Sequence, residues 1–164
     1  TGGFGLAAAR AGAAQVTLLD RSQPALDLAL ASAAATGLAG VEAIRGDAME
    51  VLERLGNEGR RFGVVVSDPP AFAKTRKDIP NALRAYARLA RLSAALVEPG
   101  GFLFIASCSH HAEAGAFFLA VAEGLFRARR IGRILWSGGA GPDHPVHPML
   151  PESAYLKAQL LQLD

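Results

Sequence analysis

The stretch FGVVVSDPPAFAK, residues 62–74, decides the fold class of this chain. Its first part, Phe62 to Asp68, is a continuous apolar run that ends in an acid, which is typical of a strand buried on both faces of a parallel sheet. Two prolines follow at once, and each fixes its φ angle and lacks an N–H donor. The strand must therefore end in a stiff turn, beyond which open parallel sheets bind their ligands.

Further strands and helices alternate on both sides of this run. Strands are predicted at residues 16–20, 41–47, 62–68 and 102–109, and helices at 23–37, 48–55, 79–97 and 114–128. This order predicts an α/β, Rossmann-like, mostly parallel sheet with helices on both faces. Two last strands, at 130–137 and 154–163, are joined by a loop without a helix, so we expect an antiparallel edge hairpin.

The organisation expected for residues 1–164 is a single catalytic domain without its first strand. A glycine loop such as TGGFG, residues 1–5, normally follows a strand, and here it opens the sequence. We therefore expect a fragment of a longer protein.

Composition favours one folded core. Of 164 residues, 51% are apolar and 20% are charged, which permits a sizeable core and argues against disorder. No uncharged apolar run approaches the roughly 18 residues of a membrane span. A single cysteine excludes an internal disulfide and suits a cytoplasmic location. The net charge of +2 permits an anionic partner without requiring one.

The glycine loop and two strand-end acids indicate a nucleoside pocket. Glycines allow a ligand to approach the backbone, and the helix that follows offers free N–H donors. Asp20 could accept bonds from two ribose hydroxyls, and Asp47 from an adenine amine. A nicotinamide dinucleotide needs an acid about 20 residues beyond the glycines, and Asp20 falls earlier. S-adenosylmethionine tolerates a looser loop. The alternative for Asp20 is a solvated helix start capped by Ser22.

The proline turn offers rigid acceptors at the pocket mouth. Asp68 and nearby carbonyls match the donors of a planar base with an exocyclic amine, and Phe72 could lie against the face of that base. The alternative is an ordinary tight turn in which Asp68 caps the next segment.

Three motifs, TGGFG, DPPAFAK and SCSHH, occur in this order at predicted strand ends. This arrangement resembles the class I S-adenosylmethionine-dependent methyltransferases, and more closely the family that makes 5-methylcytosine in large-subunit ribosomal RNA. The resemblance covers nearly the whole chain, including residues 84–104 and 143–157. It implies S-adenosylmethionine as cofactor and ribosomal RNA as partner, while a homodimer stays open.

The resemblance also implies a set of site residues. The cofactor would be held by Thr1, Gly2, Gly3, Gly5, Asp20, Arg21, Asp47, Ala48 and Asp68. The substrate would contact Pro69, Pro70, Phe72 and Lys74. Catalysis would fall to Cys108 and Asp68. The sequence departs from the family in three respects: the first strand and the amino-terminal RNA-binding domain are not among these residues, and Ala71 stands where relatives often carry lysine.

Cys108 discriminates between two kinds of methylation. Carbon 5 of cytosine is not nucleophilic until a thiolate adds to carbon 6, whereas an exocyclic amine needs no such nucleophile. One alternative is therefore a nitrogen methyltransferase in which Cys108 takes no part in the reaction. Another is that Cys108 is a small buried side chain that only packs in the core. The group that removes the carbon 5 proton is unassigned. The four histidines lack a recognised ligand spacing, so no metal is predicted.

Basic residues follow the proline turn. Lys74, Arg76 and Lys77 lie where an RNA backbone would pass. Two further sets are Arg84, Arg88 and Arg91 on one helical face, and Arg127, Arg129, Arg130 and Arg133. A solvated surface is the alternative for the helical set. An alternative to a methyltransferase is a non-catalytic RNA-binding domain of the same fold. A nicotinamide reductase is a further alternative, but it would give the proline turn no function.

Overall fold

The computed structural model describes residues 2–164, and the chain divides into two compact units, Thr1–Arg54 and Leu55–Asp164. Each unit is described by itself. Thr1, which was expected to bind the cofactor, lies outside the described residues. Helix α3 (Ala48–Asn57) begins in the first unit and ends in the second.

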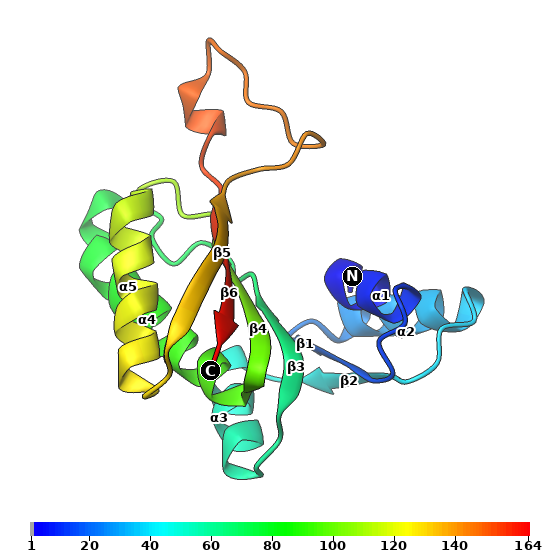
Figure 1. The fold of residues 1–164 in the computed structure, drawn as a ribbon. Coiled ribbons are helices and arrows are strands. Elements are labelled where there is room, and N and C mark those ends of the chain that lie inside the picture. The colour runs from blue at the N-terminus through cyan, green and yellow to red at the C-terminus, as the bar shows by residue number, and fades with distance from the viewer. Residues whose placement is uncertain (1) are drawn as a thin grey trace. The chain divides into compact units, whose positions relative to one another are not determined.

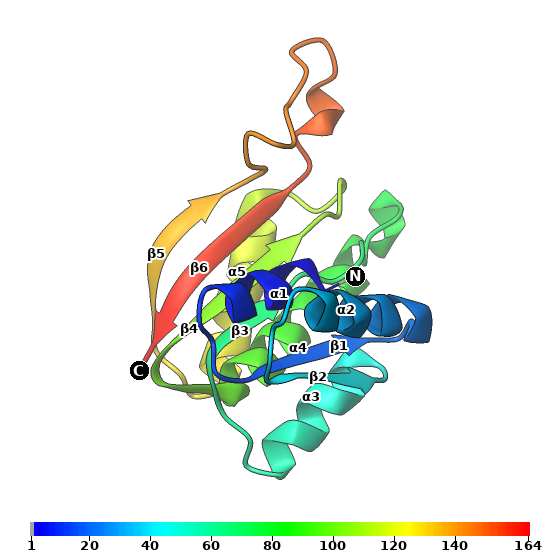
Figure 2. The same ribbon diagram turned by 90° about the vertical axis from the view of Figure 1, so that its right-hand side faces the viewer.

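The first unit is a parallel strand pair with two helices. It contains α1 (Gly3–Arg10), β1 (Val16–Asp20), α2 (Gln23–Ala35) and β2 (Val41–Arg45). In the register of the pair, Val16 lies opposite Val41 and Asp20 opposite Arg45. Helices α1 and α2 lie on the same face of this pair (Figure 2). Alternate side chains of β1, Val16 and Leu18, are buried against α2.

The second unit is a mixed four-stranded sheet in the order β3-β4-β6-β5. Its elements are β3 (Phe62–Ser67), a 3-10 helix (Arg76–Asp78), α4 (Ile79–Leu96), β4 (Val97–Ser107), α5 (Ala114–Arg127), β5 (Gly132–Gly138), a second 3-10 helix (Pro151–Ser153) and β6 (Lys157–Leu163). Strands β3 and β4 are parallel, whereas β6 is antiparallel to both β4 and β5. The loop between β5 and β6 extends beyond the ends of these strands (Figure 1).

Helices α4 and α5 lie side by side against this sheet (Figure 1). Tyr86 and Phe117, one from each helix, are fully buried, and their rings meet edge to face with centroids 5.0 Å apart. A Cβ atom at Gly124 would lie 2.5 Å from the carbonyl oxygen of Ala87, so the glycine permits the close approach of the two helices. This packing forms the core beneath the ends of β3 and β4.

The sequence predicted the α/β class and the antiparallel pairing of the last two strands, with β5 at the sheet edge, and the structure has both. The strands form a two-stranded sheet in the first unit and a four-stranded sheet in the second. A single sheet with helices on both faces therefore stays a prediction.

One expectation about β3 is wrong. The strand was expected to be buried on both faces, yet Val64 and Val66 are 59% and 41% exposed. Burial alternates because α4 covers only the face that carries Val65 and Ser67, and the Ser67 hydroxyl lies 2.8 Å from that of Ser93 on α4. No helix formed by residues 2–164 has both the length and the apolar character needed to cross a bilayer.

Candidate functional site

The three glycines at the start of α1 differ in what surrounds them. Gly2 has a φ of 75°, and a Cβ atom there would lie 2.8 Å from the Cβ of Ala29. At Gly5, a Cβ atom would lie 2.2 Å from Cδ2 of Leu18. Around Gly3 nothing lies within 4 Å of such an atom. Gly2 and Gly5 therefore serve the turn and its packing, and Gly3 leaves open space at a helix N-terminus.

Asp20 organises the turn between β1 and α2. Its Oδ1 atom accepts a hydrogen bond from the Ser22 backbone N–H at 2.8 Å, and the Ser22 hydroxyl caps α2 by accepting from Ala25 at 3.3 Å. The expected alternative, a helix start capped by Ser22, is thus present. The Asp20 side chain is nevertheless exposed, and its Oδ2 atom has no hydrogen-bond partner within residues 2–164. One carboxylate oxygen remains for a ligand.

Asp47 is an N-cap. Its Oδ1 atom accepts hydrogen bonds from the backbone N–H groups of Met49, at 2.9 Å, and Glu50, at 3.3 Å, while Arg21 pairs with Oδ2. The hydrogen bond from Glu50 is the main cause that lowers the pKa of Asp47, and Arg21 adds to it. Both carboxylate oxygens accept hydrogen bonds, and an adenine amine that donates to Asp47 would share Oδ2 with Arg21. Ala48 begins α3, where the first backbone N–H groups lack helical acceptors.

The proline turn is fastened to the end of β4. The backbone N–H of Ala73 donates to the Ser109 hydroxyl at 3.1 Å, and the ring of Phe72 tilts against Tyr86 with centroids 4.7 Å apart. Asp68 lies at the solvent-accessible side of this turn, and partial burial raises the pKa of its carboxyl. Pro69 is half-buried, whereas Pro70 and Lys74 are exposed.

Cys108 lies beside this turn. The residue follows β4 and is half-buried, and its thiol donates to the carbonyl oxygen of Pro69 at 3.7 Å. The second unit thus brings Cys108 next to the residue that follows Asp68. The sulfur therefore contacts a carbonyl oxygen of the proline turn.

Two buried serines hold the backbone on either side of the thiol. The Ser107 hydroxyl donates to the Tyr86 hydroxyl at 2.8 Å, which in turn lies 2.7 Å from the Ser109 hydroxyl. The Ser109 backbone N–H donates to the Ser107 hydroxyl at 3.2 Å. Tyr86, Ser107 and Ser109 have no exposed surface, so this network is shielded from water and its bonds are strengthened. The SCSHH motif contains both serines, whereas no motif in the sequence pointed to Tyr86.

Lys157 is a second residue that the sequence analysis missed. In the antiparallel pair of β4 and β6, Lys157 lies opposite Ser107. Its Nζ atom donates to the carbonyl oxygens of Ser109, at 2.5 Å, and Tyr155, at 3.2 Å. The residue is 7% exposed, and this burial lowers the pKa of its ammonium group, partly offset by attraction to Cys108. The one signal in the sequence is a lysine within an apolar strand.

The remaining polar residues fall into surface and structural groups. Lys74, Arg76 and Lys77, which follow the proline turn in sequence, are exposed. Arg130 is structural, because its guanidinium donates to the carbonyl oxygens of Ala94 and Val97 at 2.9 and 2.7 Å. Within residues 2–164, no three His, Cys, Asp or Glu side chains are grouped as metal ligands.

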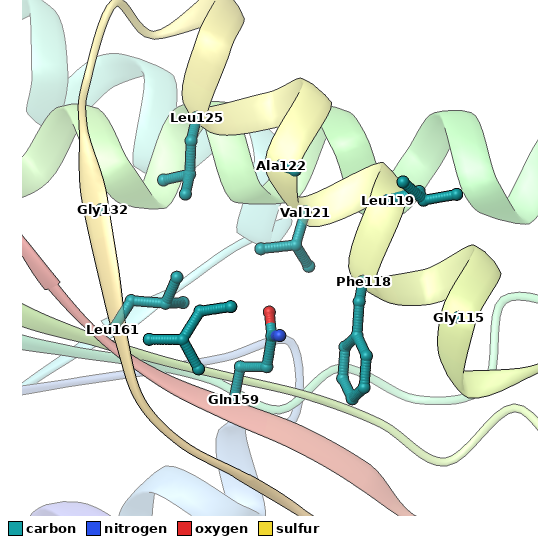
Figure 3. A pocket seen from close by; sticks show the side chains of 10 residues that line it. Gly115, Phe118, Leu119, Val121, Ala122, Leu125, Gly132, Gln159 and Leu161 are labelled. Carbon is teal, nitrogen blue, oxygen red and sulfur yellow. The ribbon is translucent and has the colours of Figure 1, made fainter.

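A cavity of about 300 Å³ lies elsewhere in the second unit, between α5 and strands β5 and β6 (Figure 3). Its wall is apolar apart from the Gln159 amide, which donates to the Ser137 hydroxyl at 3.3 Å. Asp68 and Cys108 do not line it. This cavity lacks the acids and nucleophile that the proposed chemistry needs.

Comparison with known proteins gives consistent relatives. The chain is 38% identical over 159 residues to ribosomal RNA large subunit methyltransferase I of Photobacterium profundum, covering 96% of this chain and 40% of that protein. It is 39% identical over 166 residues to the ribosomal RNA large subunit methyltransferase of Deinococcus radiodurans, covering all of this chain and 40% of the relative. The chain thus spans about two fifths of the length of the curated relatives it matches.

The fold is shared with solved methyltransferase structures. That of SMU.776, described as "a putative methyltransferase complexed with SAH", matches with a TM-score of 0.83 at 21% identity, covering 99% of this chain and 42% of that one. The fold is therefore Rossmann-like, as the sequence predicted. Residues 1–113 match the family model described as conserved hypothetical protein 95. Since this match takes in most of the sequence, the chain belongs to the conserved hypothetical protein 95 family, and it is related to the large-subunit ribosomal RNA methyltransferases.

Proposed function

We propose that this protein is an S-adenosylmethionine-dependent methyltransferase that methylates carbon 5 of a cytosine in large-subunit ribosomal RNA. The observation that carries the proposal is the position of the Cys108 thiol, 3.7 Å from the Pro69 carbonyl oxygen and beside the Asp68 turn. The names of the relatives, which are ribosomal RNA large subunit methyltransferases, support the substrate class.

The first unit has features that fit S-adenosylmethionine. Gly3 leaves open space at the start of α1, and the free Oδ2 atom of Asp20 suits a ribose hydroxyl. Arg21, the cation that follows β1, is already paired with Asp47, which disfavours a dinucleotide that carries a ribose 2′-phosphate. When bound, this cofactor supplies an electrophilic methyl group.

In the proposed reaction, Cys108 makes the substrate nucleophilic. Its thiolate adds to carbon 6 of cytosine, which leaves an enamine whose carbon 5 can accept a methyl group. A base, for which solvent water suffices, then takes the carbon 5 proton, and the electrons of that C–H bond re-form the ring double bond as the C–S bond breaks and the thiolate leaves. The fixed backbone on both sides of Cys108, held by Ser107, Ser109 and Tyr86, keeps the sulfur in place for attack.

Asp68 is proposed to hold the Watson–Crick edge of the base. A carboxyl whose pKa is raised by burial is suited to share a proton with ring nitrogen 3 as negative charge develops on the ring. Phe72, which is half-buried, is proposed to lie against the face of the base. The reacting carbons are blocked within a stacked helix, so the base must be flipped out or unpaired, and the exposed Lys74 and Arg76 suit the phosphates on either side.

The competing function is a nitrogen methyltransferase. The Asp68 turn presents acceptors that would serve an exocyclic amine equally well, and that reaction would leave Cys108 without a role.

The test uses the full-length protein with ribosomal RNA and the cofactor, followed by mass analysis of the digested nucleosides. We expect 5-methylcytosine from the wild type and none from Cys108→Ala, with Glu123→Ala, an exposed residue, as the control. A methylated guanine or adenine that Cys108→Ala still forms would establish the nitrogen alternative instead. An RNA that carries 5-fluorocytosine should trap the wild type covalently, because fluorine cannot leave as a proton does.

A further inference from the structure

We propose that Lys157 takes up the thiol proton of Cys108 and holds the resulting thiolate as an ion pair. The inference rests on the proposed function, since it assigns an activating partner to the nucleophile. Lys157 acts through Cys108 and is therefore a positioning residue.

The sheet register brings the two residues together. Lys157 on β6 lies opposite Ser107 on β4, and its Nζ atom reaches the carbonyl oxygen of Ser109 at 2.5 Å. The side chain thus extends from the residue before Cys108 to the residue after it. Strand β6 is held in this register by six paired positions along β4, so the position of Lys157 depends on the sheet rather than on a loop.

The hydrogen bonds of Nζ leave one position open. Two of its N–H groups donate to the carbonyl oxygens of Ser109 and Tyr155. An ammonium has a third N–H, and a neutral amine has a lone pair in its place. Either state keeps both carbonyl bonds, so a proton can enter or leave the third position without disturbing the loop that holds Cys108.

Charge balance favours Cys108 as the partner. A buried ammonium is costly without a counter-charge, and no carboxylate within residues 2–164 forms an ion pair with Lys157. The lowered pKa of Lys157 makes its neutral form accessible, and the attraction to Cys108 acts in the opposite direction. A thiolate at Cys108 would supply the missing negative charge.

Other titratable groups near Cys108 are accounted for. The Tyr86 hydroxyl is held by the two serines, His110 is exposed and His111 is half-buried next in sequence, and Asp68 precedes the Pro69 carbonyl. Asp68 carries a negative charge when ionised, which would oppose a thiolate. Lys157 is the buried cation of this group.

The proton transfer balances within the chain. The S–H bond of Cys108 breaks and an N–H bond forms at Nζ, which converts a thiol and an amine into a thiolate and an ammonium. When the reaction expels the sulfur from carbon 6, the thiolate returns to the ion pair. The step needs no oxidant or second reactant.

The test measures thiol reactivity and needs neither RNA nor cofactor. The full-length protein is alkylated with iodoacetamide from pH 5 to pH 10, and mass spectrometry follows the peptide that contains Cys108. Thiolates react and thiols do not, so the pH midpoint of the rate reports the ion pair. Lys157→Gln keeps N–H donors for the carbonyls but carries no charge, and Lys157→Arg keeps the charge.

We expect Lys157→Gln to move the midpoint upward and to slow alkylation at pH 7 about tenfold, as a shift of one unit implies. Lys157→Arg should keep the rate at pH 7 near that of the wild type. His110→Ala and His111→Ala should leave the pH profile of alkylation unchanged.

A folded Lys157→Gln variant whose pH profile of alkylation equals that of the wild type would overturn the inference. If Lys157→Gln fails to fold, Lys157→Arg decides, because an ordinary thiol profile there contradicts an ion pair. Methylation by Cys108→Ala would refute the proposed function and would leave this assay unaffected.

Discussion

The hydroxyl of Tyr86 on α4 lies 2.7 Å from the hydroxyl of Ser109 and 2.8 Å from that of Ser107, at the end of β4. A single side chain from the helix layer therefore holds both neighbours of Cys108. The network is buried, and removing one partner leaves the other polar groups unsatisfied.

The first prediction concerns this network. Tyr86→Phe keeps the ring packing but removes the hydroxyl, so it should lower the free energy of unfolding by about 1–3 kcal/mol. Urea denaturation of the full-length protein measures this. The matched control is Tyr155→Phe, whose hydroxyl contacts His144 in an exposed loop and should change stability by about 0.5 kcal/mol or less. Equal losses in the free energy of unfolding from the two variants would show that the buried network contributes no more to stability than an exposed hydroxyl contact.

The second prediction separates packing from ligand approach at the glycine turn. Gly5→Ala places a Cβ atom 2.2 Å from Leu18, so it should destabilise the first unit by about 1–3 kcal/mol. Gly3→Ala meets no atom within 4 Å and gains helix propensity, so it should be neutral or stabilising by up to about 1 kcal/mol.

The same pair of variants tests cofactor approach. If the space at Gly3 admits the cofactor, Gly3→Ala should weaken S-adenosylmethionine binding in calorimetry while its thermal stability is kept. Full affinity in Gly3→Ala would remove this residue from the proposed cofactor site.

The third prediction concerns Arg130. Its guanidinium bonds to the carbonyl oxygens of Ala94 and Val97 and pairs with Asp164, so it fastens the ends of α4 and β6. Arg130→Ala should cost about 2–4 kcal/mol, since charged hydrogen bonds to otherwise unpaired carbonyls are lost. Arg127→Ala removes only an exposed pair with Glu123 and should cost about 0.3–0.5 kcal/mol. If Arg127→Ala lowers the free energy of unfolding as much as Arg130→Ala does, the structural role of Arg130 is contradicted.

The class of fold could be predicted from the sequence because strand and helix periods alternate clearly. The ends of β3 and β4 could also be predicted, because proline and serine clusters interrupt the apolar runs. Burial was harder to predict. Val64 and Val66 belong to an apolar run that reads as buried on both faces, yet α4 covers only one face of β3.

Individual roles within the site depended on three-dimensional packing. Gly5 belongs to a ligand motif in sequence, but its missing Cβ atom makes room for Leu18. Asp47 stands at a ligand-binding strand end and is also the cap of α3. Lys157 could not be found, because its position beside Cys108 exists only through the antiparallel register of β4 and β6.

The last prediction is a pair of opposite pH dependences. Hydrogen bonds lower the pKa of Asp47 below its ordinary value of 3.8, so its contribution to stability is present above pH 3.8 and is lost as pH falls through the folded-state pKa. Burial raises the pKa of Asp68 above 3.8, so stability falls as pH rises from 3.8 through the raised value. At pH 7, Asp47→Asn should therefore destabilise the protein, and Asp68→Asn should stabilise it.

Denaturation of the full-length protein from pH 3 to pH 7 measures both effects, and hydrogen exchange at Met49 and Glu50 reports the cap locally. Asp68→Asn should also lose methylation activity, because an amide cannot share a proton with the base. Proteins commonly tolerate such a destabilising charge where function needs it. If Asp68→Asn is more stable and fully active, the carboxyl is not needed for methylation, and Asp68 is removed from the proposed reaction.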